Sequence, residues 1–126
     1  MTSQKITVLG AGAWGTALAL VLHQNGHAIT LWGHDSAHLT KIAREGTNEK
    51  YLPTIALPRS WRFEADIAAA TTGANFVLLA VPSRAVRVVG HGLAGFEGAV
   101  ISVTKGIEAE TGLTMCGILE QTAPRA

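Results

Sequence analysis

The stretch Val8–Leu22, VLGAGAWGTALALVL, places three glycines between a short β-branched segment and a longer apolar one. These glycines, Gly10, Gly12 and Gly15, form the pattern G-x-G-x-x-G. A residue without a Cβ atom lets the chain turn tightly and lets another group approach the main chain closely. The stretch therefore predicts a strand, a tight turn and the start of a helix, with space for a bound group beside the turn.

The segments around the turn have the periodicity of regular structure. Residues 5–9 (KITVL) are apolar and β-branched, as in a buried parallel strand. Residues 14–24 carry apolar side chains at helical spacing, and Asn25-Gly26 supplies a helix stop. Residues 27–32 (HAITLW) predict a second strand, so the glycines lie inside a β-α-β unit of about thirty residues.

The same alternation continues along the chain. We expect helices from an Asp35-Ser36 cap to Glu45, over 66–72, after Ser83 and over 113–122. We expect strands over 61–63, 75–81 and 99–103 and an irregular loop over 47–61. Strands that are apolar on both faces and alternate with helices are typical of a parallel sheet covered on both sides. The sequence thus predicts an α/β fold with a doubly wound, mainly parallel sheet and helices on both faces.

In such a unit the three glycines have separate roles. Gly10 makes the tight turn, Gly12 lets the main chain meet a pyrophosphate, and Gly15 lets the helix pack closely on the strand. Main-chain N–H groups at the helix start then face the phosphates, with help from the helix dipole. We predict a Rossmann-like dinucleotide-binding domain over residues 1–126, and the alternative is a glycine-rich turn that binds nothing.

The end of the second strand predicts which dinucleotide binds. An NAD-binding unit usually has an acidic residue there, which holds the adenosine ribose hydroxyls. In this chain the place falls on Gly33, followed by His34 and Asp35. Gly33 has no carboxylate to repel a 2′-phosphate, and His34 can donate a hydrogen bond to one. Asp35 is expected to cap the next helix, with contact to the ribose as the alternative. We therefore expect NADP(H), with NAD(H) as the open alternative.

Composition excludes several other classes of function. The 126 residues have a net charge of +1 with scattered basic residues, so nothing predicts a nucleic-acid surface. A single cysteine, Cys116, excludes an internal disulfide, fits a reducing compartment and is expected to be buried. The glycines interrupt the uncharged run 6–22, which argues against a signal peptide or a membrane span. We expect a cytoplasmic protein without membrane insertion.

No metal site is expected. His23 and His27 are four residues apart, but Gly26 should end the helix between them, and no third ligand is near in the sequence. The sequence identifies no partner for His38 or His91.

Several longer segments resemble the bacterial NAD(P)-dependent glycerol-3-phosphate dehydrogenases. They are GAGAWGTALA, NGH followed by LWGHD, NEKYLP, LLAVPS and TKGIEAETG, and they occur between Gly10 and Gly112 in the family's order and spacing. The combination of LWGHD with TKGIEAETG is specific to that family. The resemblance implies reversible hydride transfer between a nicotinamide cofactor and the pair dihydroxyacetone phosphate and sn-glycerol 3-phosphate, which supplies phospholipid synthesis.

The resemblance also implies roles for individual residues. Ala13, Trp14, His34 and Lys105 match cofactor-binding positions of the family, and Lys105 also matches a position that contacts substrate. Lys105 follows the expected strand 99–103, and ligands of open parallel sheets bind beyond the carboxyl ends of strands. An ammonium group there could attract the substrate phosphate or polarise its carbonyl.

Pro82 and Ser83 are further cofactor-binding candidates. They follow the strand 75–81 at the same edge of the expected sheet, where similar enzymes place a loop along the nicotinamide half of the cofactor. A proline and a serine are also a common strand exit and helix cap, so Ser83 has a structural interpretation as well.

The chain departs from the family in length. Similar enzymes are more than twice as long, and their second, helical domain carries the lysine taken to be the general acid/base. We therefore expect no catalytic residue within this chain, a helical substrate domain beyond residue 126, and a homodimer for the full-length enzyme. The segment alone should bind nucleotide without turnover. A stand-alone nucleotide-binding or sensory module and another hydroxyacid-type dehydrogenase remain as alternatives.

Overall fold

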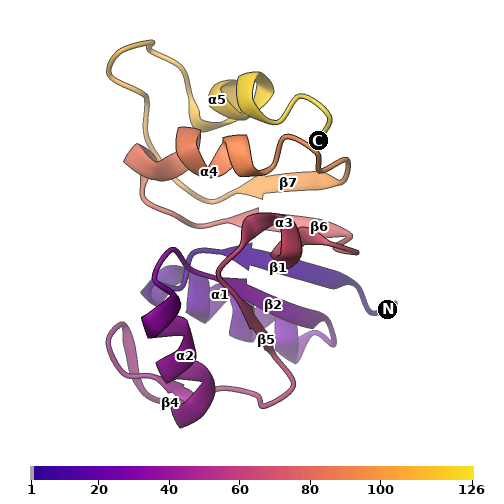
Figure 1. The fold of residues 1–126 in the computed structure, drawn as a ribbon, viewed down its shortest axis with the longest axis vertical. Helices are drawn as coiled ribbons and strands as arrows, with labels where there is room; N and C mark the ends of the chain where they lie inside the picture. Colours follow the sequence, from indigo (N-terminus) through magenta and orange to yellow (C-terminus); the bar gives the residue numbers. More distant parts are fainter. Residues whose placement is uncertain (1) are drawn as a thin grey trace.

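A five-stranded parallel sheet forms the centre of the computed structural model, which describes residues 2–126 (Figure 1). Its strands are β1 (Lys5–Leu9), β2 (Ala28–Trp32), β5 (Arg62–Glu64), β6 (Phe76–Leu79) and β7 (Ala99–Ser102), in the order β5-β2-β1-β6-β7. All four pairings are parallel. From β1 the chain adds β2 and β5 on one side of the sheet and then crosses to add β6 and β7 on the other side. The strand order therefore reverses between β1 and β6. Open sheets bind ligands at the carboxyl ends of such a switch point.

Helices cover both faces of this sheet, as expected. The helices α1 (Ala13–Gln24) and α2 (Ser36–Glu45) cover one face, and α3 (Ile67–Thr71), α4 (Val86–Gly92) and α5 (Met115–Thr122) cover the other. Figure 1 shows α4 and α5 next to β7, and α2 at the opposite end of the molecule. Successive residues of β1 serve the two cores, because Val8 packs toward α1 and α2 while Leu9 packs toward α4 and α5.

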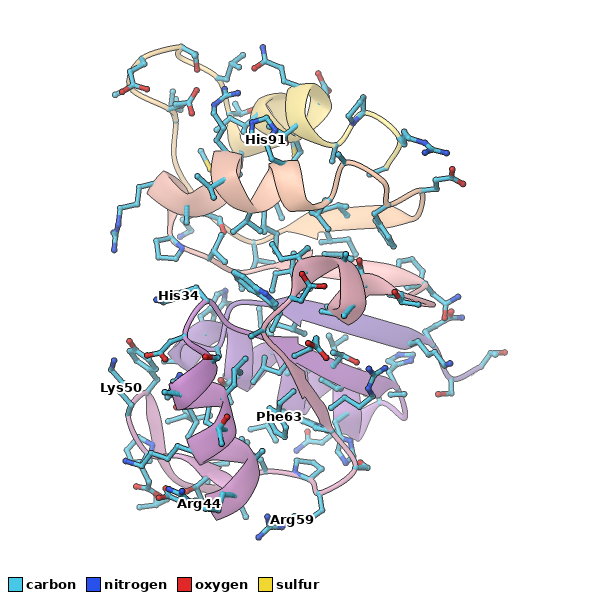
Figure 2. All side chains as sticks on the ribbon, in the orientation of Figure 1. His34, Arg44, Lys50, Arg59, Phe63 and His91 are labelled. Carbon is cyan, nitrogen blue, oxygen red and sulfur yellow. The ribbon has the colours of Figure 1, made fainter. Side chains whose placement is uncertain are left out.

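Short polar side chains begin most of these helices. Asp35 caps α2, as expected, by accepting hydrogen bonds from the N–H groups of Ala37 and His38 at 3.0 and 3.2 Å. Asp66 and Thr114 cap α3 and α5 in the same way. Such caps satisfy N–H groups that a helix leaves without partners. Figure 2 shows Arg59 near the last turn of α2, where its guanidinium donates to the carbonyl of Ala43.

The segment 47–61 is not wholly irregular, which corrects the sequence-based expectation. It contains β3 (Thr47–Asn48) and β4 (Leu52–Ala56), which pair antiparallel outside the main sheet. Pro53 lies within β4, and four of the five β4 residues are exposed. A proline-containing, solvent-facing pair of strands lacks the apolar run or alternation that signals a strand.

The strands are also not all apolar and buried on both faces. The edge strand β7 alternates between exposed and half-buried residues, and Ile101 is 49% exposed. The cause is its position, because α4 and α5 cover one face of β7 while α1 lies over the middle of the sheet. The other edge strand, β5, has no fully buried residue.

Two single residues differ from expectation. Cys116 is exposed rather than buried, because the core-facing positions of α5 are Met115, Ile118, Leu119 and Thr122. Ser83 does not cap α4 through its side chain; it begins a 3-10 turn, Ser83–Ala85, that precedes the helix. Within residues 2–126, none of the helices has the length and apolar character needed to cross a bilayer.

Truncation of a core side chain in β6 should destabilise the fold strongly. Leu79 of β6 is 0% exposed, so Leu79→Ala is expected to lower the free energy of unfolding by about 2–5 kcal/mol through lost burial and a residual cavity. Val88 of α4 is 75% exposed, so Val88→Ala should change it by less than about 0.5 kcal/mol. Urea unfolding of both variants tests this, and equal effects would contradict the described core.

Candidate functional site

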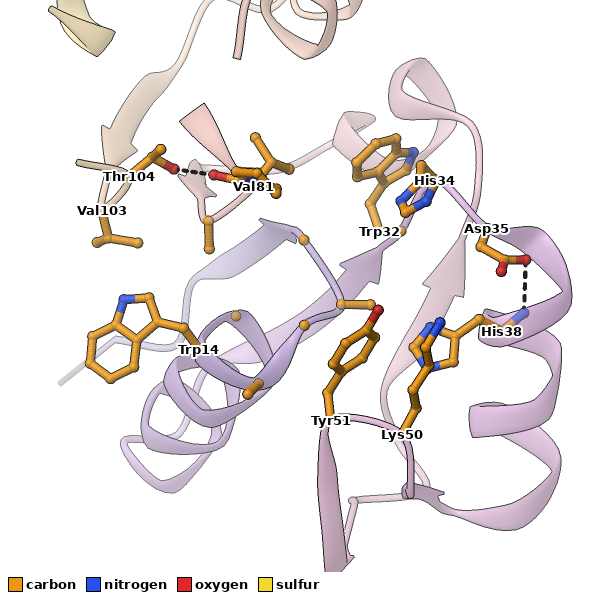
Figure 3. A pocket seen from close by; sticks show the side chains of 18 of the residues that line it. Trp14, Trp32, His34, Asp35, His38, Lys50, Tyr51, Val81, Val103 and Thr104 are labelled. Atoms are coloured by element: carbon orange, nitrogen blue, oxygen red, sulfur yellow. Dashed lines mark hydrogen bonds between the residues drawn. The ribbon is translucent and has the colours of Figure 1, made fainter. Parts of the chain in front are cut away.

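A cleft of about 510 Å³ opens at the carboxyl ends of the parallel strands (Figure 3). Its walls come from the glycine loop, the residues that follow β2, β6 and β7, and the turn between β3 and β4. It contains all the residues expected to form a site: Gly10, Gly12, Ala13, Trp14, Gly15, His34, Pro82, Ser83 and Lys105. The volume is in the range of ligand and cofactor pockets, which is about 300–1,000 Å³.

At two of the three glycine positions of the loop, a side chain would clash with a neighbouring main-chain atom. Gly10 has a φ of +128°, and a Cβ there would lie 2.5 Å from the carbonyl oxygen of Ala80. A Cβ at Gly15 would lie 2.0 Å from the carbonyl oxygen of Gly10. A Cβ at Gly12 would meet nothing within 4 Å. Gly10 therefore lets the turn pass close to the residues after β6, Gly15 lets α1 begin close to the end of β1, and Gly12 leaves the mouth of the loop open.

The start of α1 can receive an anion. Gly12 occupies the N-cap position and has no side chain to cap the helix, and the first turn carries no acidic residue. An α-helix leaves its first N–H groups without intrahelical partners, and the helix dipole adds partial positive charge there. The first residues of α1, Ala13, Trp14 and Gly15, line the cleft. A phosphate group at this point would find both donors and a favourable field.

Basic and aromatic side chains gather at the β2 end of the cleft. His34 follows β2, His38 lies on the first turn of α2, and Lys50 and Tyr51 come from the β3–β4 turn. Figure 2 shows His34 and Lys50 extending on the same side of the molecule. The Tyr51 ring meets the His38 ring edge-on at a centroid distance of 5.4 Å, and the Lys50 ammonium lies 5.1 Å from the Tyr51 ring centroid.

Asp35 is the acidic residue that lines this end of the cleft. Its carboxylate accepts the helix-capping hydrogen bonds, and the N–H of His38, followed by that of Ala37, lowers the pKa of Asp35 below its usual value. The group thus stays ionised and engaged with the helix start (Figure 3).

The segment after β7 forms the opposite end of the cleft. The Thr104 hydroxyl donates to the carbonyl of Val81 at 2.6 Å and so ties this segment to the end of β6 (Figure 3). Lys105 comes next and is exposed at the cleft. Trp14, 60% exposed, lies on the same side as Val103 in the close view. The cleft therefore has one end at β2, lined by basic and aromatic side chains and by Asp35, and a second end at β7 with Lys105.

Comparison with known proteins identifies the family. The family model for the N-terminus of NAD-dependent glycerol-3-phosphate dehydrogenase matches residues 5–126. The chain belongs to this family. It is 46% identical over 125 residues to the glycerol-3-phosphate dehydrogenase [NAD(P)+] of Anaeromyxobacter dehalogenans, which covers 95% of this chain and 37% of that one. The corresponding protein of Bacillus pumilus is 41% identical over 124 residues, 96% of this chain and 36% of that one.

Solved structures support the same assignment. The crystal structure of glycerol-3-phosphate dehydrogenase from Coxiella burnetii matches with a TM-score of 0.87 and 32% identity, over 95% of this chain and 38% of that one. D-mandelate dehydrogenase in complex with NADH has a TM-score of 0.68 at 19% identity, over 95% of this chain and 35% of that one, a likeness of fold alone. The chain thus spans little more than a third of the length of its glycerol-3-phosphate dehydrogenase relatives.

An ion pair holds the family segment TKGIEAETG in place. The Arg87 guanidinium on α4 donates from Nε to Glu108 Oε2 at 2.8 Å and from Nη2 to Glu108 Oε1 at 2.7 Å. The Thr111 hydroxyl donates to the same carboxylate. These contacts, Arg87 first, lower the pKa of Glu108 to about 2. The pair anchors the loop three residues beyond Lys105, so it limits where the lysine backbone can lie.

Several residues that line the cleft were not predicted as site residues from the sequence. His38, Lys50, Tyr51, Val103 and Thr104 all line the cleft. The family segment NEKYLP, which contains Lys50 and Tyr51, was the available signal for these two residues. His38 gave no signal, since its partner lies ten residues away on β3.

The Arg87–Glu108 pair should make stability depend on pH. The folded pKa of Glu108, about 2, lies below the unfolded value of about 4.3, so the pair contributes fully above the unfolded value. Its contribution disappears as the pH falls toward about 2. Glu108→Gln is expected to be less stable than the native chain at pH 7, with the difference shrinking at pH 3. Urea titrations at both pH values measure this, with the exposed Glu120→Gln as control; a pH-independent difference would contradict the ion pair.

Proposed function

We propose that residues 1–126 form the dinucleotide-binding domain of a glycerol-3-phosphate dehydrogenase, with a helical substrate domain following residue 126. The observation that carries this proposal is the convergence of the glycine loop, His34, Pro82-Ser83 and Lys105 on one cleft, although they come from separate parts of the chain. Family membership supports the same conclusion.

The proposed reaction is reversible hydride transfer between NAD(P)H and the pair dihydroxyacetone phosphate and sn-glycerol 3-phosphate. The glycine loop and the start of α1 would hold the pyrophosphate, with Gly10, Gly12, Ala13, Trp14 and Gly15 around it. The adenosine would lie toward β2 and the nicotinamide toward β6 and β7, along Pro82 and Ser83.

Lys105 is proposed to act on the substrate. Its ammonium group would attract the substrate phosphate or polarise the carbonyl that accepts the hydride. The general acid/base lysine is proposed to lie beyond residue 126, together with most other substrate contacts.

NADP(H) is the proposed cofactor, with NAD(H) as the weaker ligand. A 2′-phosphate at the end of β2 would meet His34 and Lys50, both of which line that end of the cleft. The carboxylate of Asp35 opposes this, but it is engaged by the N–H groups of α2. Gly33 places no side chain there, and its site is crowded, because a Cβ would lie 3.1 Å from the Cβ of Ala11.

We further propose a cytoplasmic location, a role in supplying phospholipid synthesis, and a homodimer for the full-length enzyme. The lone cysteine supports a reducing compartment. The product, sn-glycerol 3-phosphate, has the three-carbon backbone that glycerophospholipids require.

Activity of the complete enzyme tests the proposed function. We expect NADPH-dependent reduction of dihydroxyacetone phosphate by the full-length protein, and dinucleotide binding without turnover by residues 1–126 alone. Lys105→Ala should lower kcat/KM by about 10²–10³-fold, the typical cost of losing one electrostatic contact to the transition state. Lys5→Ala, at the opposite end of β1, is the control. Normal turnover by the isolated segment, or no effect of Lys105→Ala, would refute the assignment.

Calorimetric titration tests cofactor preference. NADPH should bind more tightly than NADH by about tenfold, the value of one charge-assisted hydrogen bond. Gly33→Asp should shift the preference toward NADH, because its carboxylate would repel the 2′-phosphate. Gly33→Asn is the matched control, since it crowds Ala11 equally but adds no charge. Tighter NADH binding by the native chain would contradict the proposed preference.

A further inference from the structure

Asn48 is a buried polar residue that the proposed function does not yet explain. It lies on β3 and is 0% exposed, although most of the β3–β4 hairpin around it is exposed. Its side chain does not line the cleft. A polar side chain buried this completely is tolerated only when its hydrogen bonds are satisfied.

The carboxamide of Asn48 bonds to both sides of the glycine loop. Its Nδ2 donates to the carbonyl of Ala11 at 2.9 Å and to Oγ1 of Thr16 at 2.9 Å. Ala11 lies within the loop, and the N–H of Thr16 donates to the carbonyl of Gly12 in the first turn of α1. One side chain from a distant hairpin therefore braces the loop on both sides of the open position Gly12.

These contacts also determine the tautomer of neutral His38. A carbonyl oxygen only accepts, so the Asn48 atom that faces Ala11 must be the amide nitrogen. Oδ1 then faces the His38 ring, with Nε2 at 3.0 Å. Because Oδ1 has no proton to give, Nε2 must carry one. Neutral His38 is therefore the Nε2–H tautomer, and its Nδ1 atom carries no proton and can only accept a hydrogen bond.

We propose that Asn48 is a positioning residue for dinucleotide binding. It holds the glycine loop in the geometry that receives the pyrophosphate and sets the tautomer of His38 at the adenosine end. The same hairpin carries Lys50 and Tyr51 into the cleft, and the N–H of Tyr51 donates to the Asn48 carbonyl. Asn48 thus fixes the two parts of the cleft relative to each other. This inference rests on the proposed function, because it takes the dinucleotide as the ligand.

Dinucleotide affinity provides the first test. Asn48→Ala leaves the Ala11 carbonyl and Thr16 without their donor, and Asn48→Asp places a carboxylate oxygen against that carbonyl while keeping the side-chain shape. Both variants should bind NADPH and NADH about tenfold more weakly, as expected for the loss of a buried hydrogen-bond donor. Titrations are made at a temperature where each variant is folded.

Thr7→Val is the matched control. Thr7 is also buried, at 1% exposure, and its hydroxyl donates to the carbonyl of Ala70, but it does not line or brace the cleft. This variant should lose stability and keep both affinities within about twofold of the native chain. If Thr7→Val weakened dinucleotide binding as much as Asn48→Ala, the loss of any buried hydrogen bond would have the same effect. That result would overturn the inference.

The ¹⁵N shifts of His38 provide a readout that stability alone would not move. In the native chain without ligand, neutral His38 should show the Nε2–H pattern, and in Asn48→Ala it should show a mixture of tautomers. The Nδ1–H pattern in the native chain would overturn the inference, as would native affinity in Asn48→Ala. A native chain with the Nε2–H pattern that binds neither NADPH nor NADH would instead refute the proposed function and, with it, the role of Asn48 in binding.

Discussion

The contact between the start of α1 and the end of β1 is the constraint on which the rest of the cleft depends. A methyl group at Gly15 would stand 2.0 Å from the Gly10 carbonyl oxygen, so only glycine lets the helix begin this close to the sheet. This proximity aims the open end of α1 at the reversal of strand order between β1 and β6. The ends of β2, β6 and β7 are brought to the same place by the parallel arrangement, and the cleft results from their meeting.

Each end of the cleft is supported by an element outside the central strands. At the β2 end, the β3–β4 hairpin supplies Lys50 and Tyr51 and is joined to the glycine loop through a buried amide. At the β7 end, the Arg87–Glu108 pair and the Thr104 hydroxyl hold the segment that carries Lys105. The sheet thus sets the direction of the site, and long-range polar contacts set the positions of its side chains.

Local patterns were sufficient to predict the parallel sheet and the glycine loop. Buried parallel strands such as β6 are continuous apolar runs, and the loop has a spacing that few other structures require. The cap of α2 by Asp35 was also local, because donors and acceptor are at most three residues apart.

The features that escaped prediction depend on distant partners. The hairpin over 47–56 has no core of its own to mark it in the sequence, and the His38–Asn48 contact joins α2 to β3. The exposure of Ile101 follows from how far α1 extends across the sheet, and that of Cys116 from which side of α5 faces α4. His34 and Lys105 were predicted as site residues from the family resemblance and from their places after strands, whereas Lys50 and Tyr51 were not assigned to the site.

The two edge strands of the sheet differ in how well they resist pairing with a strand of another molecule. β5 carries Arg62 and Glu64, and charged side chains on an outer strand discourage edge-to-edge association. β7 has the composition AVIS, with no charge and no proline, and among the described residues its only partner in the sheet is β6. Unsatisfied N–H and C=O groups on such a strand are a template for further β-pairing. Aggregation of the 126-residue chain at high concentration would accordingly begin along β7. The substitution Ile101→Lys would add a charge to this edge and so raise solubility.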